Sequence, residues 1–304
     1  MKIIILDANE PFKVDLINDL SEYADVYSII FQPFQKLFNK RIENVIKTKI
    51  ERIYFFPKYY KNTLSYSFVK KQFNYLVQKI RPDVLIITSP FYKDLLDFNV
   101  KVKIYYAFDN YKFYKGWNVE LVEIFEKDIV NKVDYVFASS NAIKEYFKQE
   151  YKLKGTNVLH IPNATTENFI YTKENIPNRI VNLSKPIIGC IGSIDDDRID
   201  LDLLEKLITN YTSISFVFVG SIAPSVSISK YKRIFEAKNV FLTGRLSREK
   251  IPDYLWTFDA CLIPLKNNDF NFYSSPVRLF DYIACGKPIL SADIPEVNFL
   301  FNDV

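Results

Sequence analysis

Cysteine, histidine and glycine are all scarce in this chain of 304 residues, which has three cysteines, one histidine and seven glycines. Cys190, Cys261 and Cys285 lie in apolar surroundings without paired spacing, so we expect buried free thiols. Such a pattern argues against the disulfide scaffold of a secreted protein and against a zinc site. It is typical of a reducing compartment and therefore predicts a cytoplasmic location.

Long apolar runs are missing as well. Tyr211–Ser229, which lies in the longest stretch without a charged residue, contains six serines, a glycine and a proline, so it predicts a strand and a loop instead of a transmembrane helix. The opening run Met1–Asp7 is too short and too soon acidic for a signal peptide and predicts a first strand. The turn after it lacks the G-x-G-x-x-G motif, which argues against a sugar-nucleotide epimerase or dehydrogenase.

Positive charge is concentrated in one segment. Twelve lysines and arginines stand against Glu43 and Glu51 between Phe34 and Arg81, although the whole chain carries a net charge of only +4. A solvated helical face accounts for this segment, and attraction to an anionic membrane or a phosphorylated acceptor is the alternative. No nucleic-acid-binding motif accompanies the charge, so no nucleic-acid partner is expected.

Short β-branched runs alternate with helical patterns along the chain. The expected strands are Lys2–Ala8, Asp25–Ile30, Asp83–Thr88, Val102–Ala107, Asp134–Ala138, Lys185–Ile191, Ile214–Val219, Asn239–Leu242, Ala260–Ile263 and Pro288–Leu290. The expected helices are Asn62–Ile80, Trp117–Val130, Asn141–Tyr151, Leu201–Thr209, Ser229–Phe235, Arg248–Leu255 and Pro276–Ala284. This alternation predicts an α/β fold with parallel sheets, and the restart after Asn163–Asn182 predicts two Rossmann-like doubly wound domains, residues 1–165 and 180–304.

Glycine is concentrated in the second half, where five of the seven are found. Most of these glycines follow predicted strand ends, where glycine allows a backbone to approach a phosphate closely. Ordinary turns explain any single one, but their concentration favours a nucleotide site in this half of the chain. The five are Gly189, Gly192, Gly220, Gly244 and Gly286.

One helical segment combines the features of an anion site. Ser275 is expected to cap a helix that begins with Pro276 and stops before Gly286. The free N–H groups and positive dipole end of such a helix suit a diphosphate. Asp281, one turn further in, is placed to accept hydrogen bonds from ribose hydroxyls. The alternative is an ordinary surface helix in which Asp281 pairs with Arg278.

This run, Ser274–Pro288, closely resembles the donor-site segment S-P-x-K-L-x-E-Y-x-A-x-G-K-P of family 4-type retaining glycosyltransferases, which have the GT-B fold. Further family-like motifs follow in the correct order over most of the chain. They are Val133–Ser140, Ile161–Phe169, Gly189–Ile194, Phe216–Gly220 and Val240–Leu246.

The resemblance implies roles for individual residues. It implies that Asp281 occupies the position of the ribose-binding acid, that the glycine turns approach the donor, and that basic residues offset the charge of the leaving diphosphate. The implied donor-binding residues are Gly192, Ser193, Gly244, Ser274, Ser275, Val277, Arg278 and Asp281. The candidates for the basic residues are Arg198, Arg245 and Lys250.

The sequence departs from the family pattern in several places. Tyr273 stands where many members have a first glutamate, and the frequent His-Asp step reads Phe108-Asp109. We expect Asp109 to contact the acceptor hydroxyl or act as a base, with capping of the next helix as the alternative, and Glu126 to be a surface or capping acid. Members also usually continue beyond the point that corresponds to Val304, so a truncated or unusually short chain is expected.

Together these observations predict a glycosyltransferase that moves a sugar from a nucleoside diphosphate to a hydroxyl acceptor in cell-surface polysaccharide or glycolipid synthesis. The motifs look most like those of bacterial capsule, teichuronic-acid or exopolysaccharide transferases, which implies retention, no cofactor and a peripheral place at the inner membrane face. No metal is expected, because Asp195-Asp196-Asp197 is interpreted as a polar turn. The alternatives are a non-catalytic transferase-like binding subunit and a sugar-nucleotide-modifying Rossmann enzyme.

Overall fold

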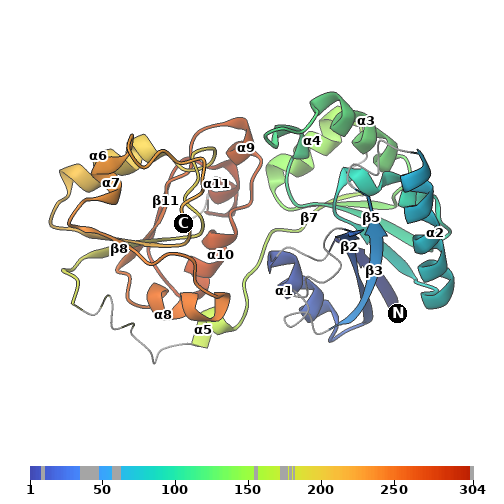
Figure 1. Ribbon diagram of the computed structural model, residues 1–304, viewed down its shortest axis with the longest axis horizontal. Helices are drawn as coiled ribbons and strands as arrows, with labels where there is room; N and C mark the ends of the chain where they lie inside the picture. The colour runs from blue at the N-terminus through green and yellow to red at the C-terminus, as the bar shows by residue number, and fades with distance from the viewer. Residues whose placement is uncertain are drawn as a thin grey trace. The chain divides into compact units, whose positions relative to one another are not determined.

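A computed structural model describes residues 1–7, 11–34, 48–56, 63–153, 157–171, 177, 180 and 182–301 (Figure 1). The chain divides into two compact units, Met1–Pro162 and Asn163–Val304. Each unit is built on one sheet whose neighbouring strands all run parallel. The predicted α/β fold with two Rossmann-like parallel sheets is therefore confirmed.

The sheet of unit 1 has seven strands in the order β3-β2-β1-β4-β5-β6-β7. Its strands are β1 Lys2–Leu6, β2 Asp25–Pro33, β3 Lys49–Phe55, β4 Val84–Ile87, β5 Val102–Ala107, β6 Tyr135–Ala138 and β7 Val158–His160. Its helices are α1 Pro11–Leu20, α2 Thr63–Ile80, α3 Val119–Val130 and α4 Asn141–Glu150, with 3₁₀ turns η3 Pro90–Asp97 and η4 Tyr111–Phe113. Because parallel crossovers are right-handed, α1 covers one face of this sheet, while α2, α3 and α4 cover the other.

Alternation along the central strands explains the core of unit 1. Ile3 and Ile5 of β1 point toward the α1 face and pack with Val14 and Ile17 of that helix. Edge strand β3 was not predicted, because Lys49, Glu51 and Arg52 interrupt its apolar residues, of which only Ile53 is buried. This composition is usual at the edge of a sheet but gives no clear strand signal.

The sheet of unit 2 has five strands in the order β10-β9-β8-β11-β12. Its strands are β8 Ile187–Ile191, β9 Ser215–Val219, β10 Val240–Leu242, β11 Ala260–Ile263 and β12 Ile289–Ser291. Its helices are α5 Asn168–Tyr171, α6 Leu201–Asn210, α7 Lys232–Phe235, α8 Ile251–Leu255, α9 Asp269–Phe272, α10 Val277–Ala284 and α11 Pro295–Phe301, and η5 spans Arg248–Lys250. The seven residues of α11 were not predicted.

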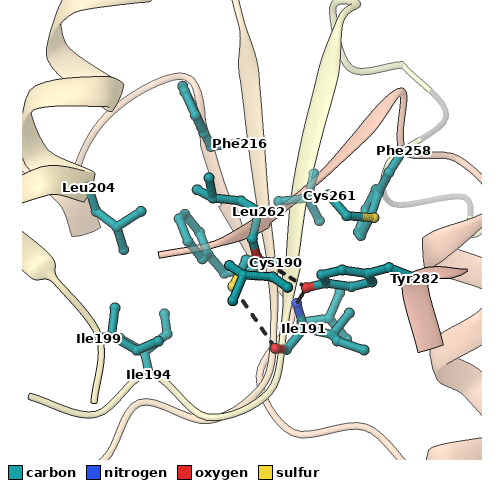
Figure 2. Close-up of a cluster of buried hydrophobic side chains, with 14 of the residues drawn as sticks. Cys190, Ile191, Ile194, Ile199, Leu204, Phe216, Phe258, Cys261, Leu262 and Tyr282 are labelled. Carbon is teal, nitrogen blue, oxygen red and sulfur yellow. Dashed lines mark hydrogen bonds between the residues drawn. The ribbon is translucent and has the colours of Figure 1, made fainter. Parts of the chain in front are cut away.

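The core of unit 2 fixes α10 against the centre of its sheet (Figure 2). The hydroxyl of Tyr282 accepts the backbone N–H of Ile191 at 2.9 Å and donates to the carbonyl of Leu262 at 3.3 Å, so one side chain bridges β8 and β11. All three cysteines are buried and free, as predicted. Within the described part of the chain, no helix is both long and apolar enough to cross a membrane.

Candidate functional site

The strand order of unit 2 defines where a ligand is expected to bind. β8 and β11 are neighbours, but the chain leaves β8 toward β9 on one side and leaves β11 toward β12 on the other. In open α/β sheets, ligands bind at the carboxyl ends of the strands where the order reverses in this way. The segments that follow β8 and β11 therefore form the candidate site.

These two segments are joined to each other beyond the strand ends. The backbone N–H of Asp200 donates to the carbonyl of Pro264 at 2.9 Å, and that of Lys266 donates to the carbonyl of Arg198 at 2.8 Å. The side-chain amide of Asn271 donates to the same Arg198 carbonyl at 2.9 Å and to that of Lys266 at 2.8 Å. Asn271 is 1% exposed, so these bonds are shielded from water and hold the loop after β8 in place.

Three glycines lie together at this edge. Gly192, directly after β8, has φ +103°, and a Cβ there would stand 2.8 Å from the Arg278 guanidinium. A Cβ at Gly220 would stand 1.9 Å from the carbonyl oxygen of Gly192, and Gly220 also pairs with Gly244, which has φ +73°. Next to them the Ser193 hydroxyl contacts the backbone carbonyl of Ser221 at 3.1 Å. The structure thus brings the predicted turn residues Gly192, Ser193 and Gly244 to one place.

The start of α10 differs from the prediction. Pro276 occupies the cap position, the helix begins at Val277, and no side chain caps it. The Ser275 hydroxyl is instead buried and has no hydrogen-bond partner in the described part of the chain. The prediction that Ser275 caps the helix was wrong, because Pro276 itself takes the extended cap conformation with φ −68° and ψ 112°. The N–H of Leu279 donates to the carbonyl of Pro276 at 3.0 Å, whereas those of Val277 and Arg278 have no acceptor among the described residues, as a diphosphate site requires.

Neighbouring segments fix the residues just before α10. Ser274 donates its hydroxyl hydrogen to the carbonyl of Asn271 at 2.9 Å. The side-chain amide of Asn163 donates to the carbonyl of Ser275 at 2.7 Å. Both serines are at least 93% buried, so the backbone here is held rigidly on the body of unit 2.

Arg278 and Asp281 do not pair with each other, so the simple surface-pair alternative is wrong. Nη1 of Arg278 lies 3.3 Å from the sulfur of Cys190. Burial raises the pKa of the Cys190 thiol, and the nearby Arg278 charge opposes that shift. Arg278 is thereby directed toward β8 and the Gly192 turn.

Asp281 is held by residues that are far away in the sequence. Its Oδ1 accepts from the Thr165 hydroxyl at 2.5 Å and from Nη2 of Arg248 at 3.1 Å, while Oδ2 lies 3.4 Å from Nη1 of Arg248. The Asp281 side chain is 3% exposed and that of Arg248 is 28% exposed. The Arg248 guanidinium also lies 4.7 Å above the ring of Phe169. A ribose can bind this carboxylate only after Arg248 or Thr165 breaks its hydrogen bond to it.

The predicted basic residues occupy two separate places. Arg198 is exposed on the loop after β8, and its guanidinium lies 4.2 Å above the ring of Phe270. Arg245 and Lys250 are exposed in the segment after β10, which is separated from β11 by β9 and β8. Arg198 thus lies on one of the two segments that form the candidate site, whereas Arg245 and Lys250 lie on the segment from which Arg248 reaches Asp281.

The aspartates before α6 form a turn, as predicted. Asp195 accepts the backbone N–H of Arg198 at 2.7 Å, and Asp200 caps α6 by accepting from Leu203 at 2.9 Å. Across the described ranges no group of three or more His, Cys, Asp or Glu residues is placed to hold a metal ion.

Asp109 follows β5 in unit 1 and does not cap the next helical turn. Its Oδ2 accepts from the Tyr114 hydroxyl at 2.5 Å, whereas Asn110 is the residue that caps η4. Phe108 is 5% exposed and stacks on Tyr106 with a ring separation of 4.0 Å. Phe108 is therefore a core residue, and Asp109 is the first residue after β5 that reaches the surface.

The expectation for Glu126 was wrong, because this residue is 1% exposed inside unit 1. Its carboxyl group accepts from the hydroxyls of Tyr105 at 2.9 Å and Tyr151 at 3.3 Å. Burial raises its pKa to about 7, although the two hydroxyls act in the opposite direction. Helical periodicity does place position 126 on the inner face of α3. The sequence therefore indicated burial at this position, although the charge of the side chain favoured an exposed one.

Comparison with known proteins identifies the class to which this arrangement is similar. Residues 185–303 match the family model described as glycosyl transferases group 1. A curated relative, the teichuronic acid biosynthesis glycosyltransferase TuaH of Bacillus subtilis, is 20% identical over 181 residues. This match covers 59% of the chain and 45% of TuaH, so the chain matches less than half of that relative's length.

Solved structures share the fold over nearly the whole chain. Sucrose-phosphate synthase from Thermosynechococcus elongatus superimposes with a TM-score of 0.75 at 13% identity, over 98% of this chain and 83% of its own. Anabaena HepE in complex with UDP and glucose gives a TM-score of 0.74 at 16% identity, over 99% of this chain and 83% of its own. The predicted resemblance to glycosyltransferases of the GT-B fold is confirmed, and residues 185–303 are the part of the chain that matches the group 1 family model.

Proposed function

We propose that this protein is a glycosyltransferase that transfers a sugar from a nucleoside diphosphate to a hydroxyl acceptor in the synthesis of a cell-surface glycan. The observation that carries the proposal is the start of α10, where uncapped N–H groups, the buried Ser275 hydroxyl and the Gly192 turn meet at the reversal point of the sheet. The matching family model covers this region. The UDP bound by HepE and the teichuronic-acid role in the name of TuaH support a UDP-sugar donor and a surface-polymer acceptor.

Nucleotide binding is the direct test of the donor site. A thermal-shift series with UDP, GDP, ADP and TDP is expected to show stabilisation by one of them, because a ligand of the folded state raises its stability. Loss of this shift in a folded Val277→Pro variant would place the nucleotide at α10, since proline removes the first N–H of the helix. Val119→Pro, at the same position of α3, is the matched control. No stabilisation by any of the nucleotides would overturn the donor assignment.

The reaction itself is proposed to be retaining and metal-independent. The α10 dipole and basic side chains, foremost Arg198, offset the diphosphate charge in place of a bound cation. Transfer is then expected to persist in excess EDTA, and NMR of the first-formed product should show the anomeric configuration of the donor. Activity that returns only when Mg²⁺ or Mn²⁺ is added would contradict metal independence. A product with inverted anomeric configuration would contradict retention.

We also propose a peripheral place at an anionic membrane, for which the described residues carry less net positive charge than the sequence indicates. Residues 35–47 and 57–62, which carry half of the basic side chains of the Phe34–Arg81 segment, lie outside the described residues. Among the described ones, three lysines form ion pairs with carboxylates and contribute less net charge. These pairs are Lys49–Asp25, Lys70–Asp97 and Lys79–Glu51.

The better support comes from apolar side chains exposed on α2. Leu64, Phe68 and Tyr75 are 83%, 41% and 63% exposed, and their spacing puts them in one stripe along the helix, beside exposed Lys71. Such a stripe suits insertion at headgroup depth. Phosphatidylglycerol vesicles should pellet the protein and phosphatidylcholine vesicles should not, with a steep decline in salt because screening acts over about 8 Å at physiological ionic strength.

Exposed-site variants separate membrane binding from a solvated face. Combined Leu64→Ser and Phe68→Ser substitutions should lower vesicle binding, whereas Ile124→Ser, at a 62% exposed position of α3, should not. If the protein pelleted equally with both kinds of vesicle, or with neither, the basic segment would be only a solvated surface and the membrane proposal would be wrong.

A non-catalytic binding subunit is the second candidate. The observation that favours it concerns Asp281. Its carboxylate is hydrogen-bonded to Arg248 and Thr165 and is nearly inaccessible to solvent. A protein that binds a nucleoside diphosphate but neither hydrolyses nor transfers any corresponding sugar donor would favour this candidate.

A further inference from the structure

The segment after β5 lies at the reversal point of the other sheet. In unit 1, β1 and β4 are neighbours from which the chain proceeds in opposite directions, so their carboxyl ends define a second candidate ligand position. The Tyr111 hydroxyl donates to the carbonyl of Thr88, just beyond β4, at 2.5 Å. Thr88 in turn donates its hydroxyl hydrogen to the carbonyl of Leu6, the last residue of β1, at 3.1 Å. Two consecutive bonds therefore tie residues 108–117 to the ends of both strands.

The side-chain amide of Asn110 is the unexplained group in this segment. Its oxygen accepts from the backbone N–H of Lys112, but its nitrogen is buried and has no hydrogen-bond partner among the described residues. Asn110 is 5% exposed. Buried amides almost always find a partner, so an unsatisfied one at a strand end points to a ligand acceptor atom. Aspartate or serine would cap η4 equally well without this orphaned donor.

Aromatic rings surround the same segment. The ring of Trp117 stacks on that of Tyr111 at 5.5 Å with an interplanar angle of 11° and lies 5.1 Å from that of Tyr114. Trp117 and Tyr114 are only partly buried, and exposed Gly116, with φ +81°, makes the turn between them. The Tyr114 hydroxyl donates to Asp109, which fixes this ring next to the carboxylate.

We propose that residues 108–117 form a saccharide site, with the hydroxyls of a sugar ring bridging Asp109 and Asn110 and its apolar face resting on Tyr114 and Trp117. A carboxylate accepts hydrogen bonds and an amide nitrogen donates them, so the pair matches neighbouring hydroxyls, which do both. Aromatic faces suit the C–H side of a pyranose because they combine an apolar surface with a polar edge. The role of this saccharide as the acceptor rests on the proposed function.

The fluorescence of Trp117 can report on binding at this site, because the chain has only two tryptophans. In a Trp256→Phe background, Trp117 is the sole tryptophan, and its emission is titrated with the methyl glycosides of glucose, galactose and N-acetylglucosamine. At least one is expected to give a saturable change. Adding Asn110→Ser keeps a capping oxygen but removes the amide donor, and should weaken this binding about tenfold, as the loss of one hydrogen bond does.

The matched control is Asn118→Ser, because Asn118 caps α3 by the same type of bond, to Leu121 at 2.8 Å, but is exposed. It should leave glycoside binding unchanged. No saturable change with any glycoside, or equal effects of the two serine variants, would overturn the inference. UDP binding, read separately by thermal shift, distinguishes the two proposals: glycoside binding without nucleotide binding would overturn the proposed function and leave the saccharide site in place.

Discussion

The buried carboxyl group of Glu126 should make the stability of unit 1 depend on pH. Its pKa is about 7 in the folded protein, because burial penalises the charged form, against an ordinary value of 4.5. Lys112 and the hydroxyls of Tyr105 and Tyr151 lower this pKa, and Glu123 raises it slightly. The folded state therefore retains a proton between pH 4.5 and 7 that the unfolded chain has released.

The sign of the effect follows from this difference in bound protons. The contribution of Glu126 to stability is largest below about pH 4.5, where this residue is protonated in both states, and is lost as the pH rises to about 7. A difference of about 2.5 units, at 1.36 kcal/mol per unit, amounts to about 3 kcal/mol. Above pH 7 the carboxyl group is ionised in both states, so this contribution stays constant.

Glu126→Gln removes the titrating group and keeps nearly the same shape. At pH 5 the variant should be about as stable as the parent protein, because glutamine resembles the protonated acid and can still accept from Tyr105. At pH 8 it should be more stable by about 3 kcal/mol, because the parent then buries a charge. Urea unfolding at several pH values, followed through Trp117 in a Trp256→Phe background, reports on unit 1.

Glu120→Gln is the control on the same helix, since Glu120 is exposed and its replacement leaves the buried carboxyl in place. Its unfolding curves should keep the pH slope of the parent. If the stabilities of the parent and Glu126→Gln ran parallel from pH 5 to pH 8, the reasoning on burial would be refuted.

Further substitutions test unit 2 and its candidate site. Asp281→Ala should weaken nucleotide binding by about 1–3 kcal/mol, measured by calorimetry, and unchanged affinity in a folded variant would dismiss Asp281 as a ribose ligand. Gly192→Ala should lower the free energy of unfolding by about 1–3 kcal/mol, because φ is +103° there and the new Cβ displaces the Arg278 guanidinium; a neutral effect in urea unfolding would contradict this. Gly189→Ala places a Cβ 1.9 Å from the buried Phe258 ring and should cost about 1–3 kcal/mol, so an unchanged thermal midpoint would argue against this packing.

Local pattern in the sequence was sufficient for the framework of the fold. The strands Val102–Ala107 and Ala260–Ile263 were predicted with the bounds that the structure has. Apolar β-branched runs identify buried parallel strands because both faces of such strands are covered, and glycine after β8 identified the turn at Gly192. The two Rossmann-like sheets and the resemblance to glycosyltransferases of the GT-B fold were both contained in patterns of a few neighbouring residues.

Only the tertiary structure decided which side chains meet. Asp281 pairs with Arg248, which is 33 residues away, and with Thr165, which is 116 residues away, instead of with Arg278 on its own helix. Arg278 reaches Cys190, 88 residues away. Spacing along a helix predicts which residues share a face but not what that face packs against. A charged residue is predicted to be exposed, but it can be buried where other elements provide hydrogen-bond partners. The periodicity of α3 puts Glu126 on its inner face, but the hydroxyls of Tyr105 and Tyr151 that bind the buried carboxyl group come from other elements, and nothing within α3 encodes them.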